Sequence, residues 1–376
     1  MSDLLNAIFD PKNWAMVPFH FWTVCVFLFG AIVGSFLNVC IHRMPRGESV
    51  IRPSSHCPGC GYSIPWYLNI PLFTWLWLRG RCAHCGEKIS PRYFLVELLT
   101  GLMFAACWVR FGHQSALVPF VFCALIGGLI AATFIDFEHF IIPDEITLGG
   151  TVVGLLLAFF VPGSHISFPF LQPMTSASAA MKDSFLGVLV GGGVVYGVLR
   201  LGKLLFGRQK VQLTPRSRIV FTETALILPE QEILYEELFY RPGDTIRFEA
   251  ERVEMIDRCY GKAKVSLQPK KLQIDGDTFD PDTVHHLEAE AEMVVLPREA
   301  MGLGDVKFMA AIGAFLGWRA VLFSLAASSL IGTLVVGMLI AMRRREWSAR
   351  LPYGPYIALA AVIWLFGGYL LLRGVF

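Results

Sequence analysis

Residues 116–137 read ALVPFVFCALIGGLIAATFIDF, a run that carries no charge before Asp136. A helix crosses the hydrocarbon core of a bilayer with roughly 17–25 apolar residues, so this run is long enough to span a membrane. The composition agrees, because 55% of the 376 residues are hydrophobic, 16% are charged and the mean hydropathy is +0.55. Soluble globular chains are rarely this apolar, so the sequence predicts a membrane protein.

Other apolar runs lie on both sides of this segment. They cover 20–41, 94–111, 145–161, 184–205, 321–342 and 354–373, with a shorter run at 303–319. Together with 116–137 they predict a polytopic α-helical membrane protein of about eight transmembrane helices. The first run is long and has no basic n-region before it, so we expect it to remain as a membrane helix rather than to be cleaved as a signal peptide.

Lysine and arginine are concentrated in alternate loops. One basic group follows the first helix, a second follows the fifth, and Arg343–Arg345 follow the seventh, whereas the loop at 162–183 holds only Lys182. Basic loops stay in the cytoplasm, so this pattern predicts both termini outside and the basic loops inside. The net charge of +2 is too small to indicate nucleic-acid binding.

Two polar inserts interrupt the helices. The second insert is no longer predominantly apolar. Polar and apolar residues alternate between turn formers at 218–222, 245–251, 263–267 and 271–274. This pattern predicts a mostly β cytoplasmic module, and the module's sequence contains no catalytic motif. The expected organisation is a first transmembrane helix (1–42), a cysteine-bearing cytoplasmic domain (43–93), helices two to five (94–206), the β-rich insert (207–300) and helices six to eight (301–376).

The first insert contains two CxxC pairs. They supply Cys57, Cys60, Cys82 and Cys85, and Gly61 and Gly86 follow directly, where we expect them to let backbone amides approach the sulfurs. Two such turns with a spacer of about 20 residues predict a tetrahedral Cys₄ zinc site, which is structural because no coordination position is left open. Disulfides are disfavoured by the cytoplasmic placement. His56 and His84 lie beside these cysteines, and we expect neither to bind the metal.

Two aspartates lie at the edges of apolar segments. Asp136 ends the run quoted above, and Asp305 lies in Gly302-Leu303-Gly304-Asp305-Val306-Lys307. Carboxylates are costly in such positions and mark function by default. In the predicted topology both lie at the cytoplasmic edge. Two adjacent carboxylates cannot both ionise easily, and a protonated and ionised pair can activate water and protonate a peptide carbonyl. We therefore expect Asp136 and Asp305 to form an aspartyl protease dyad.

Four further residues are candidates for the lining of this site. Gly302 and Gly304 leave room for a substrate strand beside Asp305. Lys307 either extends to the surface or lowers the pKa of a nearby aspartate. Glu97 either lines the site, where it binds the cationic N-terminus of a substrate, or is an interfacial residue. Asp144 follows Pro143, and its position favours an N-cap of the next helix over a catalytic role.

With these residues in place, the chain resembles the bacterial type IV prepilin peptidases over nearly its whole length. The segments that carry the resemblance, in order, are GSFLNV (34–39) with His42, Arg43 and Pro45, the two CxxC pairs, NIPL (69–72), RGRC (79–82), SPRY (90–93) running into ELLTG (97–101), Ile135-Asp136, Ile142-Pro143-Asp144, GLGDVK (302–307) and PYGPY (352–356). Each motif alone is weak evidence for the family, but the order of the motifs along the chain is specific to it.

The resemblance implies an inner-membrane enzyme whose catalytic aspartates match Asp136 and Asp305. It implies cleavage of a short basic leader after a glycine, just before the apolar N-terminal helix of a pilin or pseudopilin precursor. Many members also methylate the new N-terminus with S-adenosylmethionine, and the cysteine-bearing form is similar to those bifunctional members. The residues themselves show no methyl-donor pocket. The chain departs from the family in the long insert at 207–300.

Three alternatives stay open from the sequence. A transporter or channel would use the aspartates in an ion pathway, but it predicts polar residues deeper in the helices, and the apolar runs contain few. Another GxGD protease of membrane helices shares the mechanism but gives no reason for the CxxC domain. A non-catalytic assembly factor of a pilus or type II secretion system would tolerate loss of either aspartate.

Overall fold

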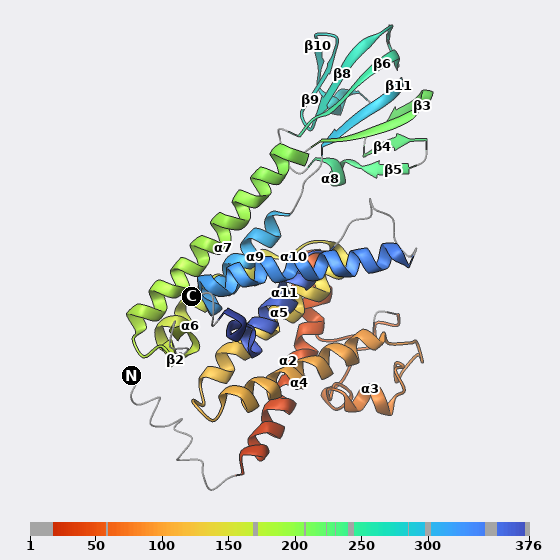
Figure 1. Cartoon of the computed structure of the whole chain (residues 1–376). Helices are drawn as coiled ribbons and strands as arrows, with labels where there is room; N and C mark the ends of the chain where they lie inside the picture. The colour runs from red at the N-terminus through yellow and green to blue at the C-terminus, as the bar shows by residue number, and fades with distance from the viewer. Residues whose placement is uncertain are drawn as a thin grey trace. The chain divides into compact units, whose positions relative to one another are not determined.

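The computed structural model describes residues 18–57, 59–167, 172–206, 208–222, 224–229, 231–239, 244–284, 286–297, 302–342 and 352–372. The basic residues Arg343–Arg345 and the N-terminal segment before residue 18, both used above, lie outside the described residues. The chain divides into two compact units (Figure 1). One comprises Met1–Tyr196 and Leu303–Phe376, and the other comprises Gly197–Gly302.

Each predicted apolar run contains a helix. The helices are α2 (Phe19–Arg43), α4 (Pro91–Phe111), α5 (Val118–His139), α6 (Asp144–Phe160), α7 (Ala177–Phe206), α9 (Leu303–Leu316), α10 (Trp318–Ala341) and α11 (Gly354–Phe366). Among the described residues five spans are long and apolar enough to cross a membrane: Phe19–Arg46, Pro91–Phe111, Val118–His139, Ala177–Leu201 and Trp318–Ala341. The helices α6, α9 and α11 have 17, 14 and 13 residues, so length supports five of the eight predicted spans.

The last helix is shorter than the sequence predicts. The apolar run continues to residue 373, but α11 ends at Phe366 because Gly367 has φ +145°, a conformation outside the helical region. A 3₁₀ segment, Gly368–Leu372, follows. Apolar composition alone therefore overestimates the length of this helix.

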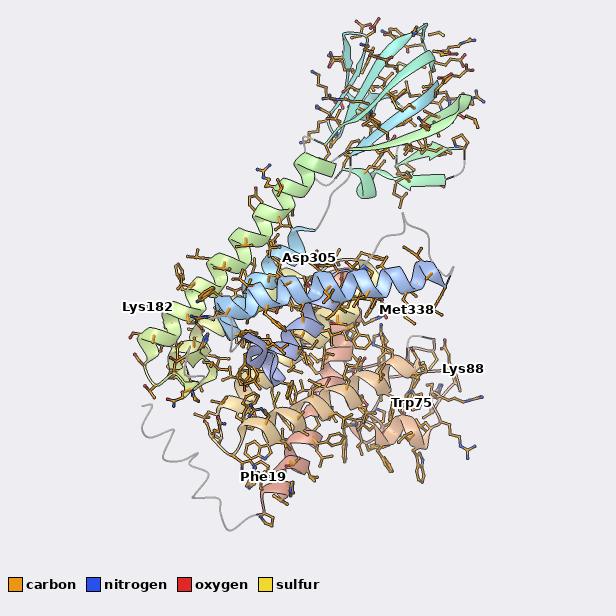
Figure 2. All side chains as sticks on the ribbon, viewed as in Figure 1. Phe19, Trp75, Lys88, Lys182, Asp305 and Met338 are labelled. Atoms are coloured by element: carbon orange, nitrogen blue, oxygen red, sulfur yellow. The ribbon has the colours of Figure 1, made fainter. Side chains whose placement is uncertain are left out.

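Helix α5 is the centre of the first unit. It contacts α2, α4, α6, α9 and α11, and 72% of its most apolar window is buried. By contrast only 17% of the corresponding window of α10 is buried, and Met338 on that helix is exposed (Figure 2). An apolar helix that is exposed in this way is suited to lipid contact. Asp136 therefore belongs to the most enclosed of the five spans that are long enough to cross a membrane.

Small residues let the helices approach closely. A Cβ added to Gly187 of α7 would lie 2.1 Å from the carbonyl oxygen of Gly313 in α9. Ser184 of α7 donates a hydrogen bond to the carbonyl oxygen of Ala314 at 2.6 Å. Close backbone approach at small residues, with hydroxyl groups that bond across the interface, is typical of helix packing in membranes. These contacts fix α9, which carries Asp305, against α7.

The segment between α2 and α4 contains short elements: η2 (Met44–Arg46), η3 (Trp66–Leu68) and α3 (Phe73–Trp77). It begins next to helix α2 and returns at Pro91, where Ser90 caps α4 by accepting a hydrogen bond from the amide of Arg92. Arg92 also forms a salt bridge with Glu138 at the end of α5. This ion pair ties the start of α4 to the end of α5 that carries Asp136.

The second unit contains an antiparallel sheet of nine described strands in the order β10-β9-β8-β6-β11-β3-β4-β5, with β7 paired to β6 (Figure 1). The strands are β3 (Arg208–Phe221), β4 (Ala225–Leu228), β5 (Gln231–Leu234), β6 (Ile246–Met255), β7 (Cys259–Tyr260), β8 (Ala263–Gln268), β9 (Lys271–Ile274), β10 (Asp277–Phe279) and β11 (Leu287–Pro297). The four predicted strand segments overlap β3, β6, β8 and β9. Residues 208–297 are called the β insert below.

Period-2 alternation builds the core of the β insert. In β6, Ile246, Phe248 and Ala250 are buried, whereas Arg247 and Glu249 are exposed. Alternate side chains of a strand point to opposite faces of the sheet, so these apolar residues reach one face together. Phe221 and Phe248 stack with ring centroids 5.4 Å apart in this core. The β insert thus has a hydrophobic core of its own.

Candidate functional site

Asp136 lies in the last turn of α5, with 5% of its surface exposed. Its Oδ2 accepts a hydrogen bond of 2.8 Å from the backbone N–H of Gly354, the first residue of α11. The carboxylate makes no other hydrogen bond to the described residues. One oxygen is therefore held by the backbone, and the other can bind a water molecule or substrate.

Asp305 lies in the first turn of α9 and is 9% exposed (Figure 2). The preceding residue, Gly304, faces Ile142, because a Cβ added to Gly304 would lie 3.5 Å from the Ile142 Cβ. A Cβ added to Gly354 would lie 3.1 Å from Cδ1 of the same isoleucine and 2.8 Å from Asp136 Oδ2. Ile142 thus contacts the backbone beside both aspartates, which brings the end of α5 and the start of α9 to one end of the bundle.

The two glycines of the GLGD motif differ in environment. Gly302 is exposed. Gly304 was expected to leave room for a substrate, but Ile142 occupies the side on which a Cβ of residue 304 would project. Gly304 therefore allows close packing against the residues that follow α5.

Lys307 pairs with Asp144. Its Nζ donates hydrogen bonds to both carboxylate oxygens, at 2.6 and 2.9 Å. The expectation that Asp144 caps a helix is wrong: the N-cap of α6 is Pro143, and Asp144 is the first helical residue and makes no capping hydrogen bond. The ion pair joins the first turns of α6 and α9. Lys307 thus binds an aspartate outside the predicted dyad.

Glu97 is buried in α4, and its Oε2 accepts a hydrogen bond of 2.7 Å from the backbone N–H of Leu72. Leu72 has φ +63°, which is unfavourable for a branched residue, and it begins the turn into α3. The carboxylate therefore holds a strained turn of the cysteine-bearing segment against α4. This contact gives Glu97 an interfacial role, which was one of the two alternatives.

The four cysteines of the CxxC pairs form one cluster. The Sγ atoms of Cys57, Cys60, Cys82 and Cys85 all lie within 4.8 Å of one another, and those of Cys57 and Cys85 are 3.8 Å apart. A tetrahedral zinc ion with Zn–S distances of about 2.3 Å requires sulfur atoms about 3.8 Å apart. The cluster therefore has the dimensions of a Cys₄ metal site.

The two halves of this cluster are built alike. Gly61 has φ +69° and donates its N–H to the carbonyl of Cys57, and Gly86 has φ +73° and donates to the carbonyl of Cys82. The glycines are needed for this left-handed turn. The sequence predicted that they let backbone amides approach the sulfurs, but their own amides bond to carbonyl oxygens instead. Each CxxC pair thus forms the same tight turn.

Backbone amides still reach one sulfur. The N–H groups of Cys85 and His84 donate to the Cys82 sulfur, and these hydrogen bonds lower the pKa of the Cys82 thiol to about 6. A thiolate is the form that binds metal. The His84 ring stacks on Tyr62, 5.0 Å away, and the His56 Nδ1 lies 3.1 Å from the carbonyl of Ser54. The cluster of potential ligand atoms consists of the four cysteine sulfurs and includes neither ring.

Comparison with known proteins identifies the family. The bacterial peptidase A24 N-terminal domain matches residues 28–111, and the type IV leader peptidase family matches residues 123–209 and 290–337. The chain belongs to the type IV leader peptidase family. The gap between the two matched parts of this family falls within the β insert.

Several relatives of this leader peptidase carry the name prepilin leader peptidase/N-methyltransferase. The protein of Myxococcus xanthus is 51% identical over 170 residues, which are 45% of this chain and 46% of the relative. That of Aeromonas hydrophila is 29% identical over 371 residues, 91% of this chain and 90% of the relative. That of Dichelobacter nodosus is 33% identical over 209 residues, 48% and 67% of the two chains. No solved structure matches this leader peptidase.

Two contacts at the candidate site were not found from the sequence. These are the hydrogen bond from Gly354 to Asp136 and the packing of Ile142 against Gly304 and Gly354. The motif PYGPY (352–356), which contains Gly354, was one of the segments that carry the family resemblance. Which backbone N–H donates to Asp136 depends on how α11 packs against α5, and a single sequence does not specify that packing.

Proposed function

We propose that this protein is a membrane aspartyl endopeptidase that removes the basic leader of type IV prepilins or pseudopilins, cutting after a glycine at the cytoplasmic face of a bacterial inner membrane. The observation that supports it best is the placement of Asp136 and Asp305: both are buried, and Ile142 packs against Gly304, which precedes Asp305, and against Gly354, which binds Asp136. Membership of the type IV leader peptidase family supports the same reaction.

In the proposed mechanism the carboxylates have complementary roles. One removes a proton from a water molecule as it attacks the scissile carbonyl, and the other donates a proton to the carbonyl oxygen. Gly354 orients Asp136 for this chemistry through its backbone N–H. Gly302 stays a candidate for the substrate side of the site, with Gly304, Glu97 and Lys307 as residues that shape it.

The proposal includes a topology of eight membrane helices with both termini outside. It places the Cys₄ cluster and the β insert in the cytoplasm, in agreement with the basic residues that surround them. We propose that the metal is zinc and that it is structural, since four thiolates complete a tetrahedral site. The substrate, with a basic leader in the cytoplasm and an apolar helix in the bilayer, then presents its scissile bond at the membrane surface.

A second activity is part of the proposal because the relatives' names include N-methyltransferase. S-adenosylmethionine would supply the methyl group to the new N-terminal amine. Mass spectrometry of the cleaved pilin tests this step separately, since the mature N-terminus is expected to carry an added methyl group. An unmethylated product would restrict the protein to proteolysis.

The proteolytic function is tested by leader cleavage in membranes that contain a prepilin and either the wild type, Asp136→Asn or Asp305→Asn. Each variant is expected to insert normally and to abolish processing. Processing by either inserted variant would exclude the dyad, and a non-catalytic assembly role would then have to be considered.

A further inference from the structure

A cavity of about 390 Å³ lies among α2, α5, α6 and α9. This volume falls within the range of roughly 300–1,000 Å³ that is typical of ligand pockets. Apart from Glu145, the side chains that line it are apolar or small, and glycines from α5 and α6 form part of its wall. The cavity therefore suits an apolar occupant that carries charge at one end only.

The cavity lies on the faces of α5 and α9 that carry the candidate catalytic aspartates. Phe308, Ile312 and Phe315 line it, and they follow Asp305 in successive steps of three, four and three residues, which places them on the same face of α9. On α5, Leu125 and Leu129 line it and share a face with Asp136 by the same periodicity.

The directions of α5 and α9 also place the cavity next to the candidate catalytic aspartates. Helix α5 ends near its aspartate and α9 begins near its own, so the lining residues of both helices lie on the membrane side of the carboxylates. The seven residues from Leu129 to Asp136 span about 10 Å at 1.5 Å per residue. An extended or helical segment that starts at the aspartates can therefore reach the cavity.

The charge at the cavity is negative. Glu145 is exposed, lines the cavity and makes no ion pair with any described residue. Its neighbour Asp144 is neutralised by Lys307. Glu145 is the second residue of α6 and follows Ile142, which packs against Gly304 and Gly354, by three residues. The single uncompensated carboxylate thus lies at the end of the cavity nearest the candidate catalytic site.

We propose that this cavity binds the first apolar residues after the scissile bond of a prepilin, while Glu145 attracts the basic leader before it. The inference rests on the proposed function and adds a substrate subsite to it. Glu145 lies at the end of the cavity nearest the aspartates, and the rest of the lining is apolar or small. This arrangement matches a precursor in which a basic leader and an apolar helix meet at the scissile bond.

Gly149 offers a direct test because it lines the cavity and nothing lies within 4 Å of a Cβ added there. A Cβ at this position would meet open space, and a leucine would add apolar volume at the wall of the cavity. Gly337 of α10 is a matched control: it is also an exposed glycine in an apolar helix with nothing within 4 Å of an added Cβ, and it does not line the cavity.

In the first experiment, cleavage of a full-length prepilin is measured in vesicles that contain Gly149→Leu or Gly337→Leu. Filling an apolar subsite by a few carbons changes specificity roughly ten- to a hundredfold. Gly149→Leu is therefore expected to lower kcat/KM by about that factor, mostly through KM, and Gly337→Leu to leave it near the wild-type value. Equal kcat/KM for Gly149→Leu and the wild type would overturn the subsite.

A second experiment does not depend on activity. Gly149→Cys or Gly337→Cys is combined with Asp136→Asn, and a prepilin with a single cysteine just after the scissile bond is added under mild oxidation. A disulfide to Gly149→Cys but not to Gly337→Cys is expected. A cavity occupied by a lipid acyl chain predicts no crosslink at either position, which would refute the proposal.

Glu145→Lys tests the charge. It is expected to lower kcat/KM for a basic leader by about tenfold, and a precursor with an acidic leader should recover that loss. Equal losses with both leaders would exclude charge recognition by Glu145.

The subsite and the proposed function can be refuted separately. If the subsite proposal is wrong, the wild type still cleaves and Gly149→Leu cleaves equally well. If the proposed function is wrong, Asp136→Asn or Asp305→Asn still cleaves. The two failures are therefore distinguishable.

Discussion

At the scale of single residues, Asp136 depends on a backbone group that is distant in sequence. Gly354 supplies the N–H that holds one carboxylate oxygen, and a Cβ at residue 354 would lie 2.8 Å from that oxygen and 3.1 Å from Ile142 Cδ1. Both distances are shorter than ordinary van der Waals contact. A glycine is required here because the carboxylate occupies the space of a side chain.

We predict that Gly354→Ala moves the Asp136 carboxylate and slows cleavage. Displacement of a catalytic group by about 1 Å costs roughly a hundredfold in rate, so we expect kcat to fall by ten- to a hundredfold with KM little changed. Steady-state kinetics on a prepilin measures this. Gly332→Ala is the control, because its added Cβ would make only ordinary contacts, at 3.7 Å, with Tyr353 and Tyr356. Wild-type kcat in Gly354→Ala would argue against a catalytic role for this hydrogen bond.

The sequence singled out the residues whose chemistry is unusual for their surroundings. An aspartate at the edge of an apolar run and cysteines at CxxC spacing are conspicuous without a structure. The interaction partners of these residues were harder to predict from the sequence. Lys307 and Asp144 are 163 positions apart, and their ion pair follows from the packing of α6 against α9. Local rules assigned Asp144 to a cap because they do not include such long-range partners.

At the scale of elements, apolar length predicted where helices occur better than where they end. Each of the eight apolar runs contains a helix, but Gly317 with φ +81° and Gly367 with φ +145° end α9 and α11 before the apolar residues do. Hydropathy does not register backbone conformation. The β insert was predicted from period-2 alternation, whereas its strand order depends on long-range pairing that alternation does not specify.

The CxxC turns provide a prediction at this scale. Cys57→Ser is expected to lower bound zinc from about one ion per chain to near zero, because three ligands on two separate turns no longer close a tetrahedral site. Elemental analysis of the purified protein measures this. We also expect a lower thermal unfolding temperature, since a structural zinc ion contributes to folding.

Cys259→Ser is the matched control for this loss. Cys259 is an exposed free cysteine of β7 and lies outside the Cys₄ cluster, so its replacement should leave zinc content and unfolding temperature unchanged. One zinc ion per chain retained in Cys57→Ser would show that the four cysteines are not the ligands.

At the scale of the whole molecule, the β insert begins and ends at neighbouring points. Arg208 at the start of β3 pairs with Pro297 at the end of β11. Paired residues of antiparallel strands have Cα atoms about 5 Å apart. The β insert also has its own hydrophobic core, and none of the candidate catalytic or metal-binding residues belongs to it. Adjacent ends and a separate core are the properties of a domain inserted into a loop.

We therefore predict that residues 208–297 can be replaced by a short Gly/Ser linker without loss of catalysis. Because the ends of the β insert lie side by side, the linker does not need to pull α7 and α9 into new positions, and kcat should stay within about threefold of the wild type. Cleavage of a prepilin in membranes measures this, with the same deletion carrying Asp136→Asn as the inactive control. A deletion variant that inserts and accumulates normally but does not cleave would contradict the prediction and would assign the β insert a direct part in substrate binding or catalysis. Retained cleavage would confine its role to partners or regulation.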